Sequence, residues 1–192
     1  MGNTVGSLSE VQHQIVVGTL LGDGTMRCKA NALLEINHSV TQARYVNWKY
    51  LQLIDLVSTP PRSRKGNAGR IAYRFVTRSV PELNEYYRQF FLNGRKQVPM
   101  VDLTPLSLAV WFMDDGSKSR DALYLNTQSF TEKDQRLLLR LLKEQHDLVG
   151  NLNRDGKYTR IRLNLESSRT LSRIIEPHVL PMFRYKLPQV TP

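Results

Sequence analysis

The sequence predicts an α+β protein of mixed α/β character, built from two copies of one αββαββα plan. An apolar run ends in Asp-Gly at Asp23 and again at Asp115, about half a chain length apart. A lysine followed closely by a proline ends each half, at Lys96 and Lys186. The helix and strand patterns between these markers occur in the same order, which indicates an internal repeat. We therefore expect one lobe over residues 1–98 and a second over residues 99–192.

Composition limits the classes of protein that are compatible with the chain. Its 192 residues are 41% hydrophobic, which excludes the composition of a disordered chain. No apolar run approaches the length of a membrane span. The single cysteine, Cys28, excludes an internal disulfide framework, and the four scattered histidines lack the spacing of zinc ligands. Because the net charge is +10 and both halves are basic, a polyanion is the expected partner.

The first helix of each half has recognisable ends. In the first half a capping box formed by Ser7 and Glu10 predicts the start, and Gly24 predicts the end. In the second half Thr104-Pro105 supplies an N-cap followed by a proline at the first helical position, and Gly116 predicts the end.

The remaining elements of the two halves match in order. Extended segments are expected over 33–40 and 122–129, second helices over 43–56 and 131–147, and final helices over 80–91 and 168–179. Between the second and final helices each half has a hairpin, with turns at 64–69 and at Asp155-Gly156. The second helix of the second half carries a stripe of leucines at helical spacing, which predicts core positions: Leu137, Leu138, Leu141, Leu142 and Leu148.

The hairpin strands separate an apolar face from a basic one. In the first half the alternation places Arg70, Arg74 and Arg78 on one face and Ile71, Tyr73 and Phe75 on the other. In the second half it places Tyr158, Arg160, Arg162 and Asn164 on one face and Ile161, Leu163 and Leu165 on the other. One such strand is most simply a solvated surface. Every charged residue between 57 and 81 is basic, however, and two such sheets favour a saddle that holds duplex DNA.

The candidate DNA-binding residues are long polar side chains of the strands, extended segments and turns. The extended segments also add Glu35 as a candidate side chain for reading bases. The predicted contacts are Arg27, Lys29, Asn37, Arg62, Arg64, Lys65, Arg70, Arg74, Arg78, Lys118, Arg120, Asn126, Gln128, Tyr158, Arg160, Arg162 and Asn164.

The repeated aspartates carry the chemistry. A carboxylate at the C-terminal end of an apolar helix is unfavourable, because the helix dipole is negative there. Since the repeat supplies both Asp23 and Asp115, divalent cations are expected to relieve the repulsion, and hard oxygen ligands suit Mg²⁺. Lys96 and Lys186 could polarise the attacking water, although exposed lysines before a proline are equally compatible with a solvated surface.

Two motifs carry a resemblance to a known family. VVGTLLGDG (residues 16–24) and LAVWFMDDG (residues 108–116), the latter within the block LTPLSLAVWFMDDGSKS followed by LYLNTQSFT, resemble the paired motifs of single-chain LAGLIDADG homing endonucleases. The resemblance implies two pseudo-twofold related lobes, with the motif helices packed at the lobe interface and saddle-shaped antiparallel sheets over the DNA. It also implies metal-dependent cleavage of both strands of a long asymmetric target, leaving short 3′ overhangs.

The resemblance assigns roles to individual residues. Asp23 and Asp115 match the catalytic carboxylates that hold metal, Gly22 and Asp114 could add backbone carbonyls, and Lys96 and Lys186 match the flanking lysines. The implied cofactor is Mg²⁺, with Mn²⁺ as a substitute and Ca²⁺ supporting binding without cleavage. The implied form is a monomer on double-stranded DNA. The sequence leaves the location open, and the resemblance alone suggests an organelle, a mitochondrion or a chloroplast. Since the first motif has Gly22 where the second has Asp114, a structural role is expected for the Asp114 side chain.

Two alternatives use the same fold without cleavage: an intron maturase that binds RNA, and a DNA-binding protein that lacks catalysis. Loss of either aspartate would favour them, whereas this sequence keeps both. Metal-dependent cleavage is the property that separates the three classes.

Overall fold

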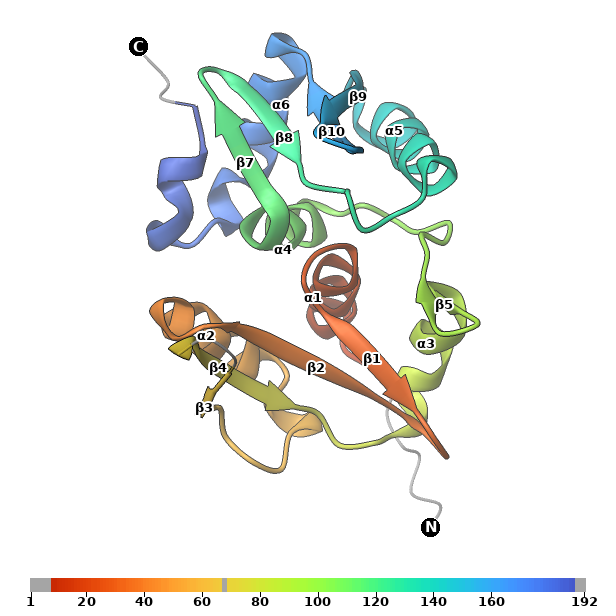
Figure 1. The fold of residues 1–192 in the computed structure, drawn as a ribbon, viewed down its shortest axis with the longest axis vertical. Coiled ribbons are helices and arrows are strands. Elements are labelled where there is room, and N and C mark those ends of the chain that lie inside the picture. Colours follow the sequence, from red (N-terminus) through yellow and green to blue (C-terminus); the bar gives the residue numbers. More distant parts are fainter. Residues whose placement is uncertain (1–7, 67–68, 189–192) are drawn as a thin grey trace. The chain divides into compact units, whose positions relative to one another are not determined.

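The computed structural model describes residues 8–66 and 69–188. The chain forms two compact units, residues 1–88 and 89–192, and each is described by itself (Figure 1). Each copy of the repeat has the predicted αββαββα order and an antiparallel four-stranded sheet, so the predicted α+β class is confirmed. Within the described ranges, none of the helices is both long and apolar enough to cross a membrane.

The first copy of the repeat contains a sheet of order β1-β2-β4-β3. Its main elements are α1 (Glu10–Leu21), β1 (Thr25–Cys28), β2 (Ala32–Ser39), α2 (Ala43–Gln52), β3 (Arg62–Lys65), β4 (Ile71–Val76) and α3 (Asn84–Phe90). Short 3-10 turns join them at η1 (Val40–Gln42), η2 (Ile54–Leu56) and η4 (Pro81–Leu83).

One face of this first sheet forms part of the core. Along β2 the side chains of Ala32, Leu34, Ile36 and His38 are buried, and the residues between them are more exposed. Helix α2 packs against β2 and β4 on the buried side. The alternation therefore leaves the opposite face of the sheet accessible.

The ends of α1 differ from the prediction. Ser9 is the N-cap: its hydroxyl accepts from the Gln12 amide at 3.2 Å, and the Gln12 side chain accepts from the Ser9 amide at 3.0 Å. The expected capping box of Ser7 and Glu10 is wrong, because Glu10 is already the first helical residue; Ser7 itself lies outside the described residues. The helix ends at Leu21, before the predicted glycine.

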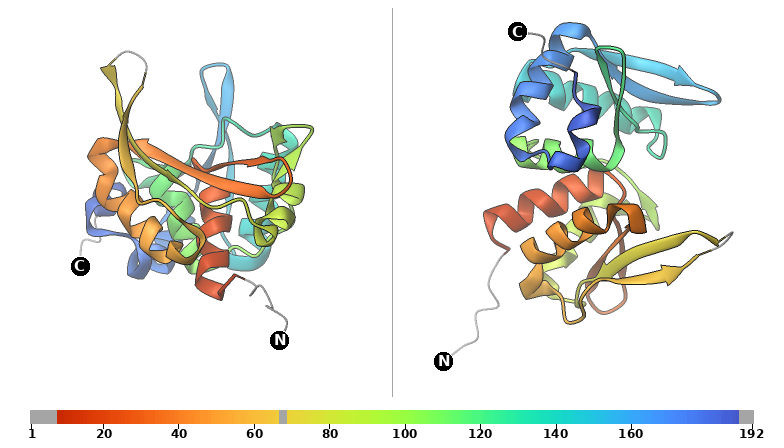
Figure 2. Two further views of the ribbon diagram at one scale, coloured as in Figure 1. Left: turned by 90° about the horizontal axis from the view of Figure 1, so that it is seen from below. Right: turned by 90° about the vertical axis from the view of Figure 1, so that its left-hand side faces the viewer.

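The second copy repeats the arrangement with a sheet of order β7-β8-β10-β9. Its main elements are α4 (Pro105–Asp115), β7 (Gly116–Ser119), β8 (Ala122–Leu125), α5 (Glu132–His146), β9 (Gly150–Asp155), β10 (Tyr158–Leu163) and α6 (Leu165–Ile175). The same unit contains the hairpin of β5 (Phe91–Leu92) and β6 (Arg95–Lys96), and the 3-10 turns η5 (Glu176–His178) and η6 (Pro181–Lys186). In Figure 2 the β3–β4 and β9–β10 hairpins each extend away from the body of their own unit.

The core of the second unit agrees with the predicted leucine stripe except at Leu137, which is only half-buried. Leu138, Leu141 and Leu142 on α5 are buried, and so is Leu148 just after the helix. Leu165 was expected on the apolar face of the strand but is 52% exposed. The reason is that β10 ends at Leu163, so Leu165 is the first residue of α6.

Candidate functional site

Asp23 lies in a tight turn at the end of a buried helix. Every residue of α1 from Ile15 to Leu21 is buried, and the Gly22 amide caps the helix by donating to the Gly18 carbonyl at 3.1 Å. The Gly24 amide donates to the Thr19 carbonyl at 2.8 Å. The Asp23 side chain itself is 47% exposed. An accessible carboxylate is thus presented at the negative end of an apolar helix.

The turn after Asp23 requires glycine. A Cβ atom at Gly24 would lie 2.4 Å from Thr19 Cγ2 and 2.7 Å from the Thr19 carbonyl oxygen. These distances are far shorter than ordinary van der Waals contacts. The Asp-Gly pair is therefore a steric requirement of the turn that presents the carboxylate.

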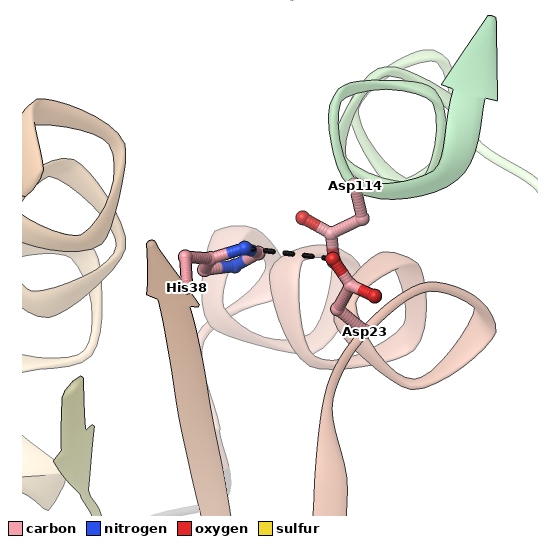
Figure 3. Close-up of side chains that lie close together, drawn as sticks. All are labelled: Asp23, His38 and Asp114. Atoms are coloured by element: carbon pink, nitrogen blue, oxygen red, sulfur yellow. Dashed lines mark ion pairs between the residues drawn. The ribbon is translucent and has the colours of Figure 1, made fainter. Parts of the chain in front are cut away.

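His38 lies beside Asp23 and was not among the predicted site residues. Its Nδ1 is 3.5 Å from Asp23 Oδ2, and its side chain is only 3% exposed (Figure 3). The ring packs against Tyr45, with 5.2 Å between the ring centroids. The signal that could have located it is the β1–β2 pairing: Thr25 pairs with Glu35, so residues just before β1 lie near the end of β2.

Asp115 is the last residue of α4. Thr104 caps the helix by accepting from the Ser107 amide at 3.2 Å, and Pro105 occupies the first turn, as predicted. The Asp115 carbonyl accepts from the Asn126 amide at 2.9 Å. A Cβ atom at Gly116 would lie 2.3 Å from the Phe112 carbonyl oxygen, so the second Asp-Gly pair is required for the same reason as the first.

Lys186 lies at the same end of α4 as Asp115. Its ammonium donates to the Met113 carbonyl at 2.8 Å and lies 3.5 Å from the Phe112 carbonyl oxygen. The ammonium also lies over the Phe183 ring, 5.1 Å from its centroid. A cation at a helix C-terminus offsets the negative dipole, so Lys186 lowers the cost of a carboxylate in the last turn of α4.

Lys96 has a different environment. It lies on β6, where it pairs with Phe91, and it belongs to the 89–192 unit. Its ammonium lies over the Phe130 ring, 5.6 Å from the centroid. The role expected for Lys96 beside the first motif stays a prediction.

The accessible face of the first sheet carries arginines in a fixed row. Asn37 on β2 pairs with Arg74 on β4, which pairs in turn with Arg62 on β3. Glu35 receives two guanidinium groups, from Arg27 at 3.0 Å and from Arg74 at 3.0 Å. Arg27 and Arg74 are therefore held by Glu35 before any partner binds.

The corresponding face of the second sheet is centred on Arg160. Its guanidinium donates to the Asn126 side-chain oxygen at 3.1 Å and lies 4.5 Å from the centre of the Tyr124 ring. Asp155 is 3.8 Å from the same guanidinium and accepts from the Gln128 amide group at 2.8 Å. Asp155, which was not predicted as a site residue, thus links two of the predicted DNA contacts.

Three further predicted contacts have structural partners. The Lys118 ammonium donates to the Leu187 carbonyl at 2.7 Å, and Arg78 donates to the Asp55 carbonyl at 2.6 Å. Asn164 caps α6 by accepting from a backbone amide of its first turn. Each of these three side chains therefore has a structural role that does not require DNA. The other predicted contacts are exposed: Lys29, Arg64, Lys65, Arg70, Arg120, Tyr158 and Arg162.

The end of each motif helix, taken by itself, offers oxygen donors that suit a hard divalent cation. Asp23 and Asp115 each supply carboxylate oxygens, and the carbonyls of Gly22 and Asp114 belong to the same helix ends. Oxygen ligands of this kind suit Mg²⁺ or Ca²⁺ and do not select soft metals. The residues present therefore fit the metal that the motifs imply.

The chain is similar to known proteins over most of its length. A family model described as "LAGLIDADG DNA endonuclease family" matches residues 13–171. The chain is 27% identical over 211 residues to cytochrome b mRNA maturase bI2 of Saccharomyces cerevisiae, which covers 97% of this chain and 49% of that protein. It is 32% identical over 205 residues to protein RecA of Mycobacterium gastri, covering 94% of this chain and 48% of that protein. The chain thus spans about half the length of these two relatives.

Solved structures share the fold. The homing endonuclease I-WcaI bound to its DNA recognition sequence matches with a TM-score of 0.85 and 23% identity, covering 97% of this chain and 94% of that one. I-DmoI in complex with DNA and Ca matches with a TM-score of 0.51 and 14% identity, covering 87% of this chain and 88% of that one. One fold relative was therefore solved on its DNA recognition sequence and another with DNA and calcium.

Proposed function

Because the chain belongs to the LAGLIDADG DNA endonuclease family, we propose that it is a site-specific endonuclease that hydrolyses both strands of a long asymmetric DNA target and leaves short 3′ overhangs. The observation that carries the proposal is the repeated carboxylate: Asp23 and Asp115 each occur at the C-terminal end of an apolar motif helix, next to a glycine that cannot be replaced without a clash. The helix dipole makes such a position costly unless a cation is bound there.

In this proposal the two motif aspartates bind the metal, and the two lysines offset the negative charge around it. Asp23 and Asp115 would hold Mg²⁺, which when bound supplies activation of water and stabilisation of the leaving oxygen in phosphodiester hydrolysis. Lys186 lies at the end of α4 and offsets negative charge there, both from the helix carbonyls and from an incoming phosphate. We assign Lys96 the corresponding role for the first motif.

The accessible faces of the two sheets are assigned to the DNA. Each face places an arginine beside an asparagine, Arg74 with Asn37 and Arg160 with Asn126. Arginine reads guanine and asparagine reads adenine in the major groove, and a basic face attracts phosphates through counterion release. Because the two faces differ in most other side chains, a single chain would recognise an asymmetric target as a monomer.

A homing role within an intron is the biological setting that we propose. The second motif block is similar to that of the yeast mitochondrial omega-intron endonuclease. The relatives reported above are a maturase, RecA, I-WcaI and I-DmoI, so this narrower resemblance rests on the motif block alone.

An RNA-binding maturase is the second candidate function, and a specific observation favours it. The yeast relative at 27% identity is named a cytochrome b mRNA maturase. The same basic faces could contact intron RNA, and salt-sensitive binding would not separate the two functions. Retention of both motif aspartates favours cleavage.

The experiment that tests the proposed function is selection of cleaved sites from a randomised duplex library. The purified chain is incubated with the library in Mg²⁺, in Mn²⁺, in Ca²⁺ and in EDTA, and broken ends are captured and sequenced. We expect one asymmetric sequence to be enriched with Mg²⁺ or Mn²⁺ only. Absence of any enriched cleaved sequence with Mg²⁺ and Mn²⁺ would reject the endonuclease in favour of a binding function.

A further inference from the structure

Glu35 is an acidic side chain at the centre of a basic sheet face. One of its carboxylate oxygens receives Arg27 at 3.0 Å and the other receives Arg74 at 3.0 Å. The Glu35 side chain is 15% exposed, compared with 27% for Arg74 and 67% for Arg27. The carboxylate is therefore enclosed between the two guanidinium groups that it binds.

The strand register explains why these three side chains meet. Glu35 on β2 lies opposite Thr25 on β1, so Arg27 is its diagonal neighbour on one side. Arg74 on β4 lies opposite Asn37 and is the diagonal neighbour on the other side. Diagonal neighbours on one face of a sheet are within reach of long side chains. The contact thus joins three strands across the accessible face.

An anion in this position opposes the binding of any polyanion. It weakens the attraction of Arg27 and Arg74 for phosphates, so a surface selected for general DNA affinity would not retain it. A guanidinium group, however, has five N–H donors in a rigid fork, and one ion pair leaves most of them free. Holding one edge of the fork fixes the direction in which the other donors point.

We propose that Glu35 is a specificity-determining positioning residue, which orients Arg27 and Arg74 for the base edges of the DNA target and lowers their affinity for phosphates of other sequences. The proposal rests on the proposed DNA-binding function. It assigns Glu35 no contact with the reacting phosphate. Its effect on recognition passes through the two arginines.

The second sheet shows the same device built from different residues. Arg160 is held on one side by Asn126 and on another by Asp155, and its guanidinium stacks on Tyr124. In both sheets the arginine has an asparagine neighbour: Arg74 pairs with Asn37 in the strand register, and Arg160 donates to Asn126 just after β8. An oriented arginine beside an asparagine therefore recurs in both halves, which supports a selected arrangement in place of a chance surface ion pair.

The test compares specific with non-specific binding in Ca²⁺. A target duplex is first selected by binding from a random library, and a scrambled duplex of equal length and composition serves as competitor. Glu35→Gln removes the charge and frees both arginines. We expect its affinity for the scrambled duplex to rise, with a salt dependence steeper by roughly one phosphate contact. We expect its preference for the target over the scrambled duplex to fall by about tenfold or more.

Glu132→Gln is the matched control. Glu132 on α5 also forms an ion pair with an arginine, Arg136, at 2.6 Å, and it lies on a helix away from the sheet face. The substitution changes the net charge by the same amount. We expect an unchanged preference for the target duplex. A Glu35→Gln protein that behaves like Glu132→Gln would overturn the proposal, as would one that gains affinity equally for both duplexes.

Arg27→Lys keeps the test decisive if Glu35→Gln does not fold. Arg27 is largely exposed, so the substitution preserves the fold and the charge while removing the planar fork. We expect the preference for the target to fall with little change in affinity for the scrambled duplex. An unchanged preference overturns the proposal. If the wild-type chain prefers no duplex, both the proposed function and this inference fail. If the wild-type chain has a preference and both variants keep it, this inference alone is rejected.

Discussion

Replacing Gln135 by leucine should weaken the second unit by about 3 kcal/mol. The side chain is 1% exposed on α5 and forms three hydrogen bonds. Its amide group donates to the carbonyls of Thr127 at 2.7 Å and Thr159 at 2.8 Å, and its oxygen accepts from the Thr159 hydroxyl at 2.6 Å. One glutamine therefore joins α5 to β10 and to the segment that follows β8.

The magnitude follows from what the leucine leaves behind. A hydrogen bond contributes about 1 kcal/mol net, and a buried acceptor without a donor costs roughly 1–3 kcal/mol. Three bonds are lost, and the Thr127 and Thr159 carbonyls lose their donor. The penalty of the two orphaned carbonyls replaces the net value of their bonds, and the half-buried Thr159 hydroxyl can turn to water, so the expected total is about 3 kcal/mol. That is a large part of the roughly 5–15 kcal/mol by which a domain is usually stable.

Equilibrium unfolding in urea measures the effect. Trp48 lies in the first unit and Trp111 in the second, so Trp48→Phe leaves a fluorescence signal from the second unit. Lys133→Leu places the same leucine on the exposed side of α5 and should change the free energy of unfolding by no more than about 0.5 kcal/mol. A loss below about 1 kcal/mol for Gln135→Leu would refute the reasoning.

Two further predictions concern Lys186 at the end of α4 and an alkaline transition. Lys186→Met removes the donor to the Met113 carbonyl, so the single-turnover rate of DNA cleavage in Mg²⁺ should fall about a hundredfold. Target affinity in Ca²⁺, measured by titration, should stay within about threefold. Equal losses of cleavage rate and of affinity would contradict a catalytic role. Burial, with a smaller contribution from Glu10, raises the pKa of Tyr86 to about 12. The stability that this proton supplies is fully present below pH 10 and is lost as the pH rises toward 12, so melting temperatures measured over that range should decline in the wild type and less in Tyr86→Phe. Identical declines in both proteins would contradict the assignment.

The repeat made most of the fold predictable. An apolar helix just before each Asp-Gly pair, the matched element order and the alternation along β2 could each be read from the sequence, and all three are present in the structure. Helix ends were harder, because Ser7 and Ser9 both precede an acidic or amide residue at capping-box spacing. Only the backbone path shows that Ser9 supplies the cap.

What the sequence did not show depends on strand register. His38 was missed beside Asp23, and the pairing of Glu35 with Arg27 and Arg74 was not foreseen, because these partners come from other strands or turns. Pairing between strands far apart in sequence decides which side chains meet, and a shift of one residue exchanges the faces. The face on which Lys65 lies could not be predicted for the same reason. Lys65 was grouped with its arginine neighbours, yet the β3–β4 register places it on the opposite face of the sheet from Arg62 and Arg64.

The measurement that tests the central claim most directly is double-strand cleavage of the selected duplex by Asp23→Asn and by Asp115→Asn. Asp55→Asn and Asp121→Asn, at exposed positions of the first and second unit, are matched controls for the change of charge. The account predicts that each motif variant loses double-strand cleavage in Mg²⁺ and keeps target binding in Ca²⁺, whereas both controls cleave normally. Cleavage of both strands at the wild-type rate by the two motif variants would contradict the assignment of these carboxylates as the catalytic pair.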